Sequence, residues 1–248
     1  MSQGLIPVSE TEQSYLNNYN IHDFDVPLTT VDSVLFTVQD GQLFTLLVQR
    51  ANHPAKGMWG LPGGFVDTQQ DTDLDHCAQR HLQQKTGIEA PFLQPLVALG
   101  NGQRDPRGWS TSISFYALMA HADCQHYVDT VSDVQWFPLA QAQQMSLAFD
   151  HTKILDLALK QLQQKALDSL VLAYALPETF TLTQLQHLHE VILGRSIQSK
   201  SFRRRIEQAQ VLQDTGEVSD TQGKGKRPSL YRLKPDIAEY RFVRNLEA

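Results

Sequence analysis

Two segments decide the fold that this sequence predicts: Trp59-Gly60-Leu61-Pro62-Gly63-Gly64-Phe65-Val66-Asp67 and Arg80-His81-Leu82-Gln83-Gln84-Lys85-Thr86-Gly87-Ile88. The glycines of the first segment permit tight turns and close approach of the backbone. A helix is expected from about Leu74 to Lys85, since Gly87 just beyond is typical of a helix C-terminus. The two segments therefore predict a glycine-rich loop that leads into a helix.

Apolar, β-branched runs on both sides of this unit predict strands. Strands are expected at residues 31–38, 43–50, 92–99, 110–120 and 134–139. Asp40-Gly41 separates the first two runs and is a hairpin turn signal. A helix is expected at 147–167, where Ile154, Leu155 and Leu162 recur on one stripe. Residues 1–170 are thus predicted to form a mixed α/β domain.

From about residue 171 the pattern changes to short helices and one hairpin. Thr181-Leu182-Thr183-Gln184 is a capping-box pattern, which predicts a helix start, and Gly194 ends that helix. A second helix is expected from Ser199, with Phe202 and Ile206 on its buried stripe. Strands at 211–214 and 229–233 enclose a tip rich in Gly, Lys and Arg. Residues 171–248 therefore predict a winged helix-turn-helix.

Composition describes an ordinary soluble chain, with 41% hydrophobic and 19% charged residues among 248. No apolar run is long enough to span a bilayer. The start of the chain lacks the basic and apolar regions of a secretion signal. Cys77 and Cys124 give no disulfide framework. We expect a cytoplasmic protein without membrane contact, in which residues 1–19 form a polar arm, either ordered or in contact with a second copy.

The net charge of −6 is unevenly distributed. From Glu178 onward there are 12 Lys and Arg against 9 Asp and Glu, a net charge of +3, so the preceding part carries −9. A sign reversal of this kind favours a polyanionic partner for the second domain. A solvated basic face is the alternative.

Residues 57–88, with their flanking elements over roughly residues 30–165, resemble the Nudix hydrolase family. That family reads Arg-Glu-apolar-x-Glu-Glu-x-Gly-apolar where this chain has Arg80 to Ile88, with a further Glu upstream. Arg80, Leu82, Gly87 and Ile88 match. The four Glu positions of the family are occupied by Thr72, His81, Gln84 and Lys85.

The resemblance implies that the Nudix chemistry is lost. Nudix hydrolases cleave a diphosphate by metal-assisted attack of water, and Mg²⁺ requires several oxygen ligands, mostly carboxylates. The four positions have lost their anionic ligands and Lys85 adds a positive charge, so a Mg²⁺ ion there would meet net repulsion. We expect no metal, no cofactor and no catalytic residue. The alternative is that nearby carboxylates take over: Asp67, Asp71, Asp73 and Asp75.

A pocket that binds a nucleotide without hydrolysing it is typical of a sensor. Arg50, Lys56 and Arg80 are suited to phosphates as charge-assisted donors. The loop Arg104-Asp105-Pro106-Arg107-Gly108-Trp109 resembles the Arg-Asp-Pro-Arg-Gly loop of Nudix regulators of NAD metabolism and related ADP-ribose hydrolases. Phe65 or Trp109 would stack on adenine. The candidate ligand-binding residues are Arg50, Lys56, Phe65, Arg80, Arg104, Asp105, Arg107 and Trp109.

In the second domain, the second predicted helix presents basic side chains opposite its apolar stripe. This is the arrangement that a recognition helix needs in the major groove. The Gly-Lys-Gly-Lys-Arg-Pro tip at 223–228 is suited to a wing against phosphates or a minor groove. Arg205 lies nearer the apolar stripe. The candidate DNA-binding residues are Arg195, Lys200, Ser201, Arg203, Arg204, Lys224, Lys226 and Arg227.

The order of domains resembles the Nudix-related transcriptional regulators of NAD metabolism, the NrtR family. Leu193-Gly194-Arg195, Phe202-Arg203-Arg204 and the stretch 227–232 carry this resemblance in the second half. It implies a homodimer that represses genes of NAD biosynthesis or salvage at a palindromic operator and is released by ADP-ribose. Three alternatives are an active ADP-ribose hydrolase with an accessory DNA domain, a regulator that senses a free sugar, and a protein-interaction module.

Overall fold

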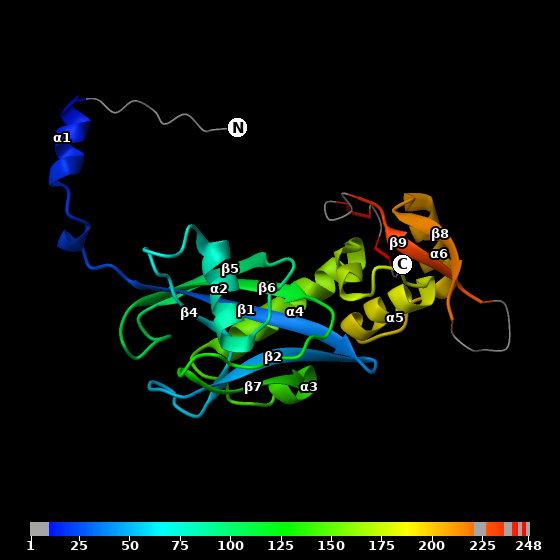
Figure 1. Cartoon of the computed structure of the whole chain (residues 1–248), viewed down its shortest axis with the longest axis horizontal. Coiled ribbons are helices and arrows are strands. Elements are labelled where there is room, and N and C mark those ends of the chain that lie inside the picture. The colour runs from blue at the N-terminus through cyan, green and yellow to red at the C-terminus, as the bar shows by residue number, and fades with distance from the viewer. Residues whose placement is uncertain (1–9, 221–226, 236–239, 243–244, 247–248) are drawn as a thin grey trace.

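The computed structural model describes residues 10–220, 227–235, 240–242 and 245–246, which form a mixed α/β body and a smaller lobe (Figure 1). The strands of the body are β1 (Leu28–Gln39), β2 (Gln42–Arg50), β3 (Trp59–Gly60), β4 (Gly63–Phe65), β5 (Gln94–Asn101), β6 (Ser110–Leu118) and β7 (Val131–Pro138). Its helices are α2 (Leu74–Thr86), α3 (Leu139–Ala142) and α4 (His151–Asp168). The predicted fold class is confirmed.

The sheet is organised around β1, which is buried on both faces. The strand order is β3-β2-β1-β6-β5, with β4 paired to β1 and β7 paired to β2. Val34 and Phe36 of β1 belong to the apolar cluster beneath α4, whereas Leu35 belongs to the cluster beneath α2. Successive strand residues point to opposite faces, so an uninterrupted apolar run serves a strand covered on both sides.

Local turn signals act as predicted, and one predicted helix start is wrong. In the β1–β2 turn, Asp40 and Gly41 have φ of 50° and 72°, the left-handed values of a type I′ turn. Gly87 ends α2 at φ 71°. The helix predicted from residue 147 begins only at His151, because Phe149 has φ of 53°, which an α-helix does not accommodate.

The smaller lobe is a helix-turn-helix followed by a two-stranded hairpin. Its elements are α5 (Leu182–Leu193), α6 (Ser199–Ala209), β8 (Leu212–Val218) and β9 (Ser229–Leu233). Thr181 and Gln184 form the predicted capping box, and Gly194 ends α5 in the left-handed region. Phe202 and Ile206 are buried in a separate apolar cluster of this lobe. The hairpin tip at 221–226, with Lys224 and Lys226, lies outside the described residues.

The helix α4 connects the two lobes, running from the sheet toward α5 (Figure 1). Leu188 and Ile192 of α5 lie in the same apolar cluster as Ile154 and Leu155 of α4, so the core of the body continues into the lobe. The short helix η2 (Val171–Ala175) follows α4 directly. A shared core of this kind couples the placement of the lobe to that of α4.

The end of the chain also returns to α4. The backbone N–H groups of Phe242 and Leu246 donate to the carbonyl oxygens of Asp168 and Leu167, at 2.8 and 2.7 Å. These carbonyls belong to the last turn of α4, where carbonyl groups have no hydrogen-bond donors within the helix. The C-terminal segment therefore fixes the junction between the lobes.

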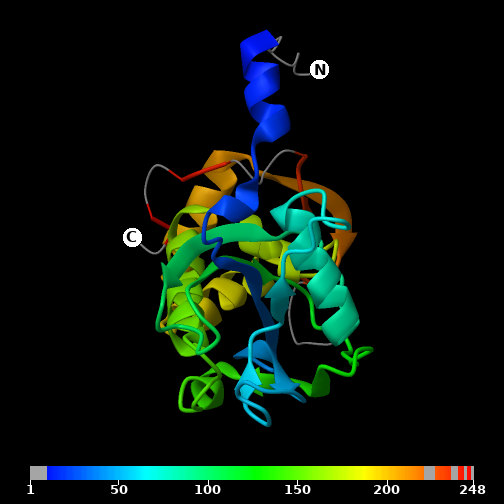
Figure 2. The same cartoon turned by 90° about the vertical axis from the view of Figure 1, so that its left-hand side faces the viewer.

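The N-terminal arm projects away from the body in both views (Figures 1 and 2). It comprises α1 (Glu10–Asn18) and the short helix η1 (Ile21–Asp23), and residues 11–27 are all exposed. The arm exposes six large apolar side chains: Tyr15, Leu16 and Tyr19 within residues 1–19, which were predicted to be polar, and Ile21, Phe24 and Val26 beyond them. Among the described residues, no helix is long and apolar enough to cross a membrane.

Candidate functional site

A cavity of about 770 Å³ opens between the glycine-rich loop, α2 and the 104–107 loop. Its size lies within the range of about 300–1,000 Å³ found for ligand pockets. Six of the eight predicted ligand-binding residues line it: Arg50, Phe65, Arg80, Arg104, Asp105 and Arg107. Segments that are far apart in the sequence therefore meet at one site.

The other two predicted ligand-binding residues do not line this cavity. Lys56 is exposed on the loop before β3. Trp109 is 54% exposed, and its indole lies over Gly100, where an added Cβ would come within 3.0 Å of the ring. Of the two aromatic residues suggested for stacking, only Phe65 faces the cavity.

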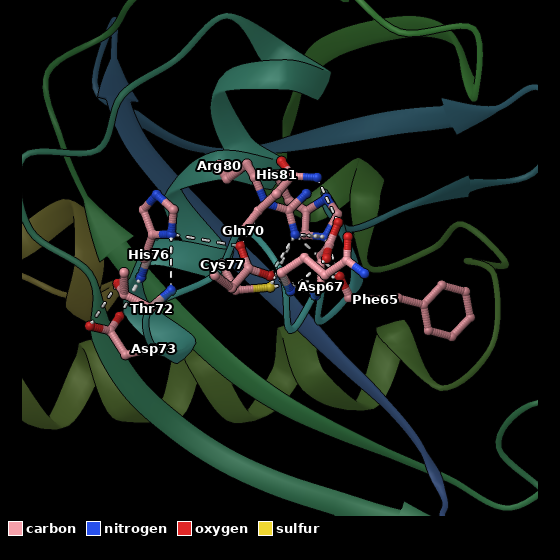
Figure 3. Close-up of polar contacts among 11 residues, drawn as sticks. Phe65, Asp67, Gln70, Thr72, Asp73, His76, Cys77, Arg80 and His81 are labelled. Atoms are coloured by element: carbon pink, nitrogen blue, oxygen red, sulfur yellow. Dashed lines mark hydrogen bonds and ion pairs between the residues drawn. The ribbon is translucent and has the colours of Figure 1, made fainter.

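The face of α2 toward the cavity carries three of the residues that replace the family's glutamates: His81, Gln84 and Lys85. The ring Nε2 of His81 lies 2.9 Å from the carbonyl oxygen of Phe65 (Figure 3). Burial lowers the pKa of His81 to about 4, so its ring is neutral at pH 7. The Nζ of Lys85 donates to the carbonyl oxygen of Gly63 in the glycine loop.

Nearby carboxylates do not replace the missing glutamates. Arg80 donates two hydrogen bonds of 2.7 Å to Asp71, whose side chain is 1% exposed, and this guanidinium holds the pKa of Asp71 far below its usual range. Asp73 caps α2 by accepting from the N–H of His76, and Asp67 accepts from Gln70 within its own loop (Figure 3).

The remaining candidate, Asp75, is exposed in the first turn of α2. Within the described ranges, no group of three or more His, Cys, Asp or Glu residues is placed to hold a metal ion. The residues present therefore do not fit the divalent cation that a Nudix fold implies, because hard cations need several oxygen ligands. Arg80 is committed to Asp71 and contributes its positive charge to the cavity wall.

A buried polar network forms the floor of the cavity. Arg104 donates to Asp150 from Nε at 3.1 Å and from Nη2 at 2.8 Å, and its Nη2 lies 3.8 Å from Asp32. The hydroxyl of Ser112 donates to Asp32. His151 accepts a 2.8 Å hydrogen bond at Nδ1 from the N–H of Leu61, so its Nε2, 3.5 Å from Asp32, carries the proton when the ring is neutral.

Two arginine–aromatic contacts shape the mouth of the cavity. The guanidinium of Arg107 lies 4.8 Å above the Phe65 ring and is held by two hydrogen bonds to Asp105. Arg50 lies 4.8 Å above the ring of Phe149. Burial lowers the pKa of Arg50, with Arg107 adding to the effect. Flat guanidinium and aromatic surfaces of this kind are suited to a planar base and to phosphate groups.

The lining of the cavity carries more basic than acidic side chains. The basic residues are Arg50, Arg80, Lys85, Arg104 and Arg107, and the acids are Asp32, Asp67 and Asp105. Arg80 and Arg104 also pair with Asp71 and Asp150 outside the lining, so the cations face the cavity while two of their carboxylate partners lie behind them. Donors arranged in this way are suited to an anionic ligand. Asp32, Asp150 and His151 were not among the predicted site residues. The sequence offered a signal for one of them, Asp32, because an acid is unusual within an apolar strand.

The second candidate surface is the exposed face of α6. Lys200, Arg203 and Arg204 are exposed there, and Arg203 donates to the hydroxyl of Thr183 at 3.4 Å. Ser201, which the sequence placed with them, is only 9% exposed and lies on the packed side of the helix. Arg205 is half-buried, as its position near the apolar stripe predicted.

The other predicted DNA-binding residues lie at the ends of the lobe's elements. Arg195 is exposed just after α5, and Arg227 is exposed just before β9. The three exposed cations of α6 and these two arginines all belong to the helix-turn-helix and its hairpin. Exposed basic side chains on such elements are of the kind that contacts base edges and phosphates in a major groove.

Two family models match the chain: the NUDIX domain over residues 27–158 and the NrtR DNA-binding winged helix domain over residues 172–233. The fold and the two surfaces thus define a Nudix domain joined to a winged helix domain. The chain belongs to the NrtR family, as its sequence resemblance predicted.

Individual relatives agree with this assignment over nearly the whole chain. The "ADPR responsive transcriptional repressor NtrR" of Acinetobacter baylyi is 41% identical over 96% of this chain and 94% of its own length. NrtR of Shewanella oneidensis, solved with a 27mer DNA, is 53% identical at a TM-score of 0.79, covering 88% of this chain and 99% of that chain. The NUDIX domain of the same protein, solved with ADP ribose, is 48% identical at a TM-score of 0.60, covering 61% of this chain and 98% of that chain.

Proposed function

We propose that this protein is a transcriptional repressor that binds operator DNA through α6 and its hairpin and is released when ADP-ribose occupies the body cavity. The single observation that carries the proposal is that one chain combines a basic winged helix with a cavity suited to phosphates. That cavity has His81, Gln84 and Lys85 where the family has metal-binding glutamates. The relative named as an ADPR responsive repressor and the Shewanella complexes with DNA and ADP ribose support it. The expected targets are genes of NAD biosynthesis or salvage.

The Nudix domain acts in this proposal as a receptor and not as an enzyme. His81 is neutral and Lys85 basic on the face where the family's cation lies, and Arg80 neutralises Asp71. A water molecule is not activated there without a coordinated cation. Incubation with ADP-ribose and Mg²⁺ should therefore release no AMP. Brisk release of AMP would favour the active hydrolase.

The helix α4 transmits the state of the cavity to the DNA-binding lobe. Arg104 holds Asp150, the residue just before α4. The last turns of α4 contact α5 through a 2.8 Å hydrogen bond between the carbonyl oxygen of Ala166 and the Nδ1 of His189. ADP-ribose diphosphate competes with Asp150 for the Arg104 guanidinium, because both are anions suited to its bidentate donors. Loss of that ion pair frees the first turn of α4 to move.

The junction leaves room for such a movement. A second cavity, of about 360 Å³, lies among β6, α4 and η2, with Tyr116, Leu162 and Tyr174 in its lining. Release requires only that ADP-ribose binds the DNA-incompetent arrangement more tightly than the competent one. The coupling between the two sites is therefore the quantity to measure.

A homodimer is part of the proposal, since a palindromic operator presents two equivalent half-sites. The exposed apolar arm supports it. Contiguous exposed apolar side chains mark interaction sites, and a nine-residue helix is too short to be stable alone in water. A second copy that covers Tyr19 and Phe24 would stabilise α1. Light scattering should give a dimer mass for the wild type and a smaller mass for a Tyr19→Ser, Phe24→Ser variant.

The decisive experiment measures operator affinity with and without ADP-ribose. The operator is first selected from random duplexes by the purified protein, and its affinity is then followed by fluorescence anisotropy. ADP-ribose should weaken binding, whereas NAD and arabinose should not. An operator affinity that ADP-ribose leaves unchanged contradicts the proposal, and release by arabinose instead favours the sugar sensor. Binding without salt dependence would favour a protein-interaction module, since phosphate contacts release counterions.

A further inference from the structure

We propose that Lys85 supplies the positive charge that a metal ion supplies in a Nudix hydrolase: its ammonium binds the diphosphate of ADP-ribose, so effector binding needs no divalent cation. The inference rests on the proposed function and names how the same cavity recognises its ligand. It starts from the misfit described above, in which the cavity has the shape for a nucleoside diphosphate but lacks the ligands for a metal ion.

The position of Lys85 is the first support. It lies on α2 one turn after His81, lines the cavity, and donates one N–H to the carbonyl oxygen of Gly63. A lysine ammonium has three N–H donors, so two remain for a ligand. Within the described part of the chain, no carboxylate forms an ion pair with this nitrogen. The ammonium is thus anchored by a neutral partner, and Asp32 acts on its charge only from a distance.

The anchoring loop is itself held in place, which fixes the ammonium. A Cβ added to Gly63 would lie 2.2 Å from the carbonyl oxygen of Val31, and one added to Gly64 would lie 2.4 Å from the His81 ring. The loop is therefore packed against β1 on one side and α2 on the other. A donor fixed before the ligand arrives loses little conformational freedom on binding.

The surrounding charges also fit an incoming anion. The groups that act on Lys85 are Asp32 on β1, Arg50 on β2, and Arg80 on its own helix, beside neutral His81. Asp32 is already engaged by the Ser112 hydroxyl. The pKa of Lys85 is lowered to about 8, chiefly by burial; Asp32 opposes this shift, and Arg50 and Arg80 add to it. A diphosphate beside the amine would favour its charged form.

The test is calorimetric titration of the full chain with ADP-ribose, once with excess EDTA and once with Mg²⁺. Wild type should bind with the same affinity in both buffers. Lys85→Met should bind about ten- to hundredfold more weakly in both, the loss expected for a charge-assisted hydrogen bond. The matched control is Lys160→Met, an exposed lysine of α4 outside the cavity, which should bind like wild type.

Thermal unfolding separates a lost contact from a lost fold. Lys85→Met should melt at or above the wild-type temperature at pH 7, because burial disfavours the ammonium and the substitution removes it. Binding that requires Mg²⁺, or Lys85→Met binding within twofold of wild type, overturns the inference and leaves the proposed function standing. Failure of wild type to bind ADP-ribose in either buffer contradicts the proposed function itself.

Discussion

Arg104 and Asp150 form a two-point ion pair, 3.1 and 2.8 Å long, between the loop over the cavity and the residue that directly precedes α4. The Arg104 side chain is 5% exposed and that of Asp150 is 21% exposed, so water screens the pair only in part. The pair places the ligand loop in direct contact with the helix that continues into the DNA-binding lobe.

Asp150→Asn should uncouple the two sites. The neutral amide of Asn holds Arg104 less strongly than the carboxylate does, so ADP-ribose breaks a weaker interaction when it binds. The factor by which ADP-ribose weakens operator binding should therefore fall toward one. Calorimetry should still show ADP-ribose binding of at least wild-type strength. Asp156→Asn, a surface substitution on the same helix, is the control and should retain wild-type coupling. Wild-type coupling in Asp150→Asn would show that the ion pair is not the link.

The affinity for ADP-ribose should fall as pH rises above 8. The pKa of Lys85 is about 8 in the free protein, and an adjacent diphosphate raises it in the complex. The complex therefore holds more protons than the free protein near pH 8, and raising the pH weakens binding by at most about tenfold per pH unit. Titration in buffers of different ionisation enthalpy should show proton uptake at pH 8. Lys85→Met should show none, and equal uptake in both proteins would assign the proton to another group.

Replacing Phe65 should weaken ADP-ribose binding more than replacing Trp109. Phe65→Ala should weaken ADP-ribose binding by about 1–3 kcal/mol, the loss found when an aromatic residue that stacks on a base is replaced by alanine. Trp109→Ala should have a much smaller effect, because its indole lies over Gly100 outside the cavity. Calorimetric titration of both variants decides between them. The reverse order would move the adenine site to the far side of the 104–109 loop.

The basic residues of α6 should make two kinds of contact with DNA, one with bases and one with phosphates. Arg204→Ala should cost about 1–3 kcal/mol on the selected operator and relax its sequence preference, as loss of an arginine–guanine contact does. Lys200→Ala should weaken all duplexes alike and reduce the slope of log affinity against log salt by about one. Anisotropy titrations over a salt series measure both quantities. Neither change should affect ADP-ribose binding, and a parallel loss there would indicate misfolding.

Much of this fold could be predicted because its signals are local. The Asp40-Gly41 turn, the capping box at Thr181 and the helix-ending Gly87 each act through neighbouring residues, so a short stretch of sequence contains the whole cause. The alternation of Val34, Leu35 and Phe36 between two cores follows from the strand repeat alone. Such features need no knowledge of distant parts of the chain.

The candidate site was less predictable because its partners are distant in sequence. Arg104 is held by Asp150, and Asp32 is approached by His151; only the folded sheet brings these residues together. The sequence identified Arg80 as a cation but gave no sign that Asp71 engages it. Phe149 could not be recognised as the residue that delays α4, since a left-handed backbone is rare for a bulky residue and nothing in the neighbouring sequence signals it.

The return of the C-terminal segment to α4 bears on how the protein is labelled. Leu246 is fully buried two residues before the last residue, and its N–H and that of Phe242 occupy the final carbonyls of α4. An affinity tag or fluorescent protein fused after Ala248 would be attached two residues beyond the buried Leu246, next to the junction between the lobes. A reporter placed before the N-terminal arm avoids that junction, so a biosensor built from this chain should carry its fluorophore there, with the dimer mass checked after labelling.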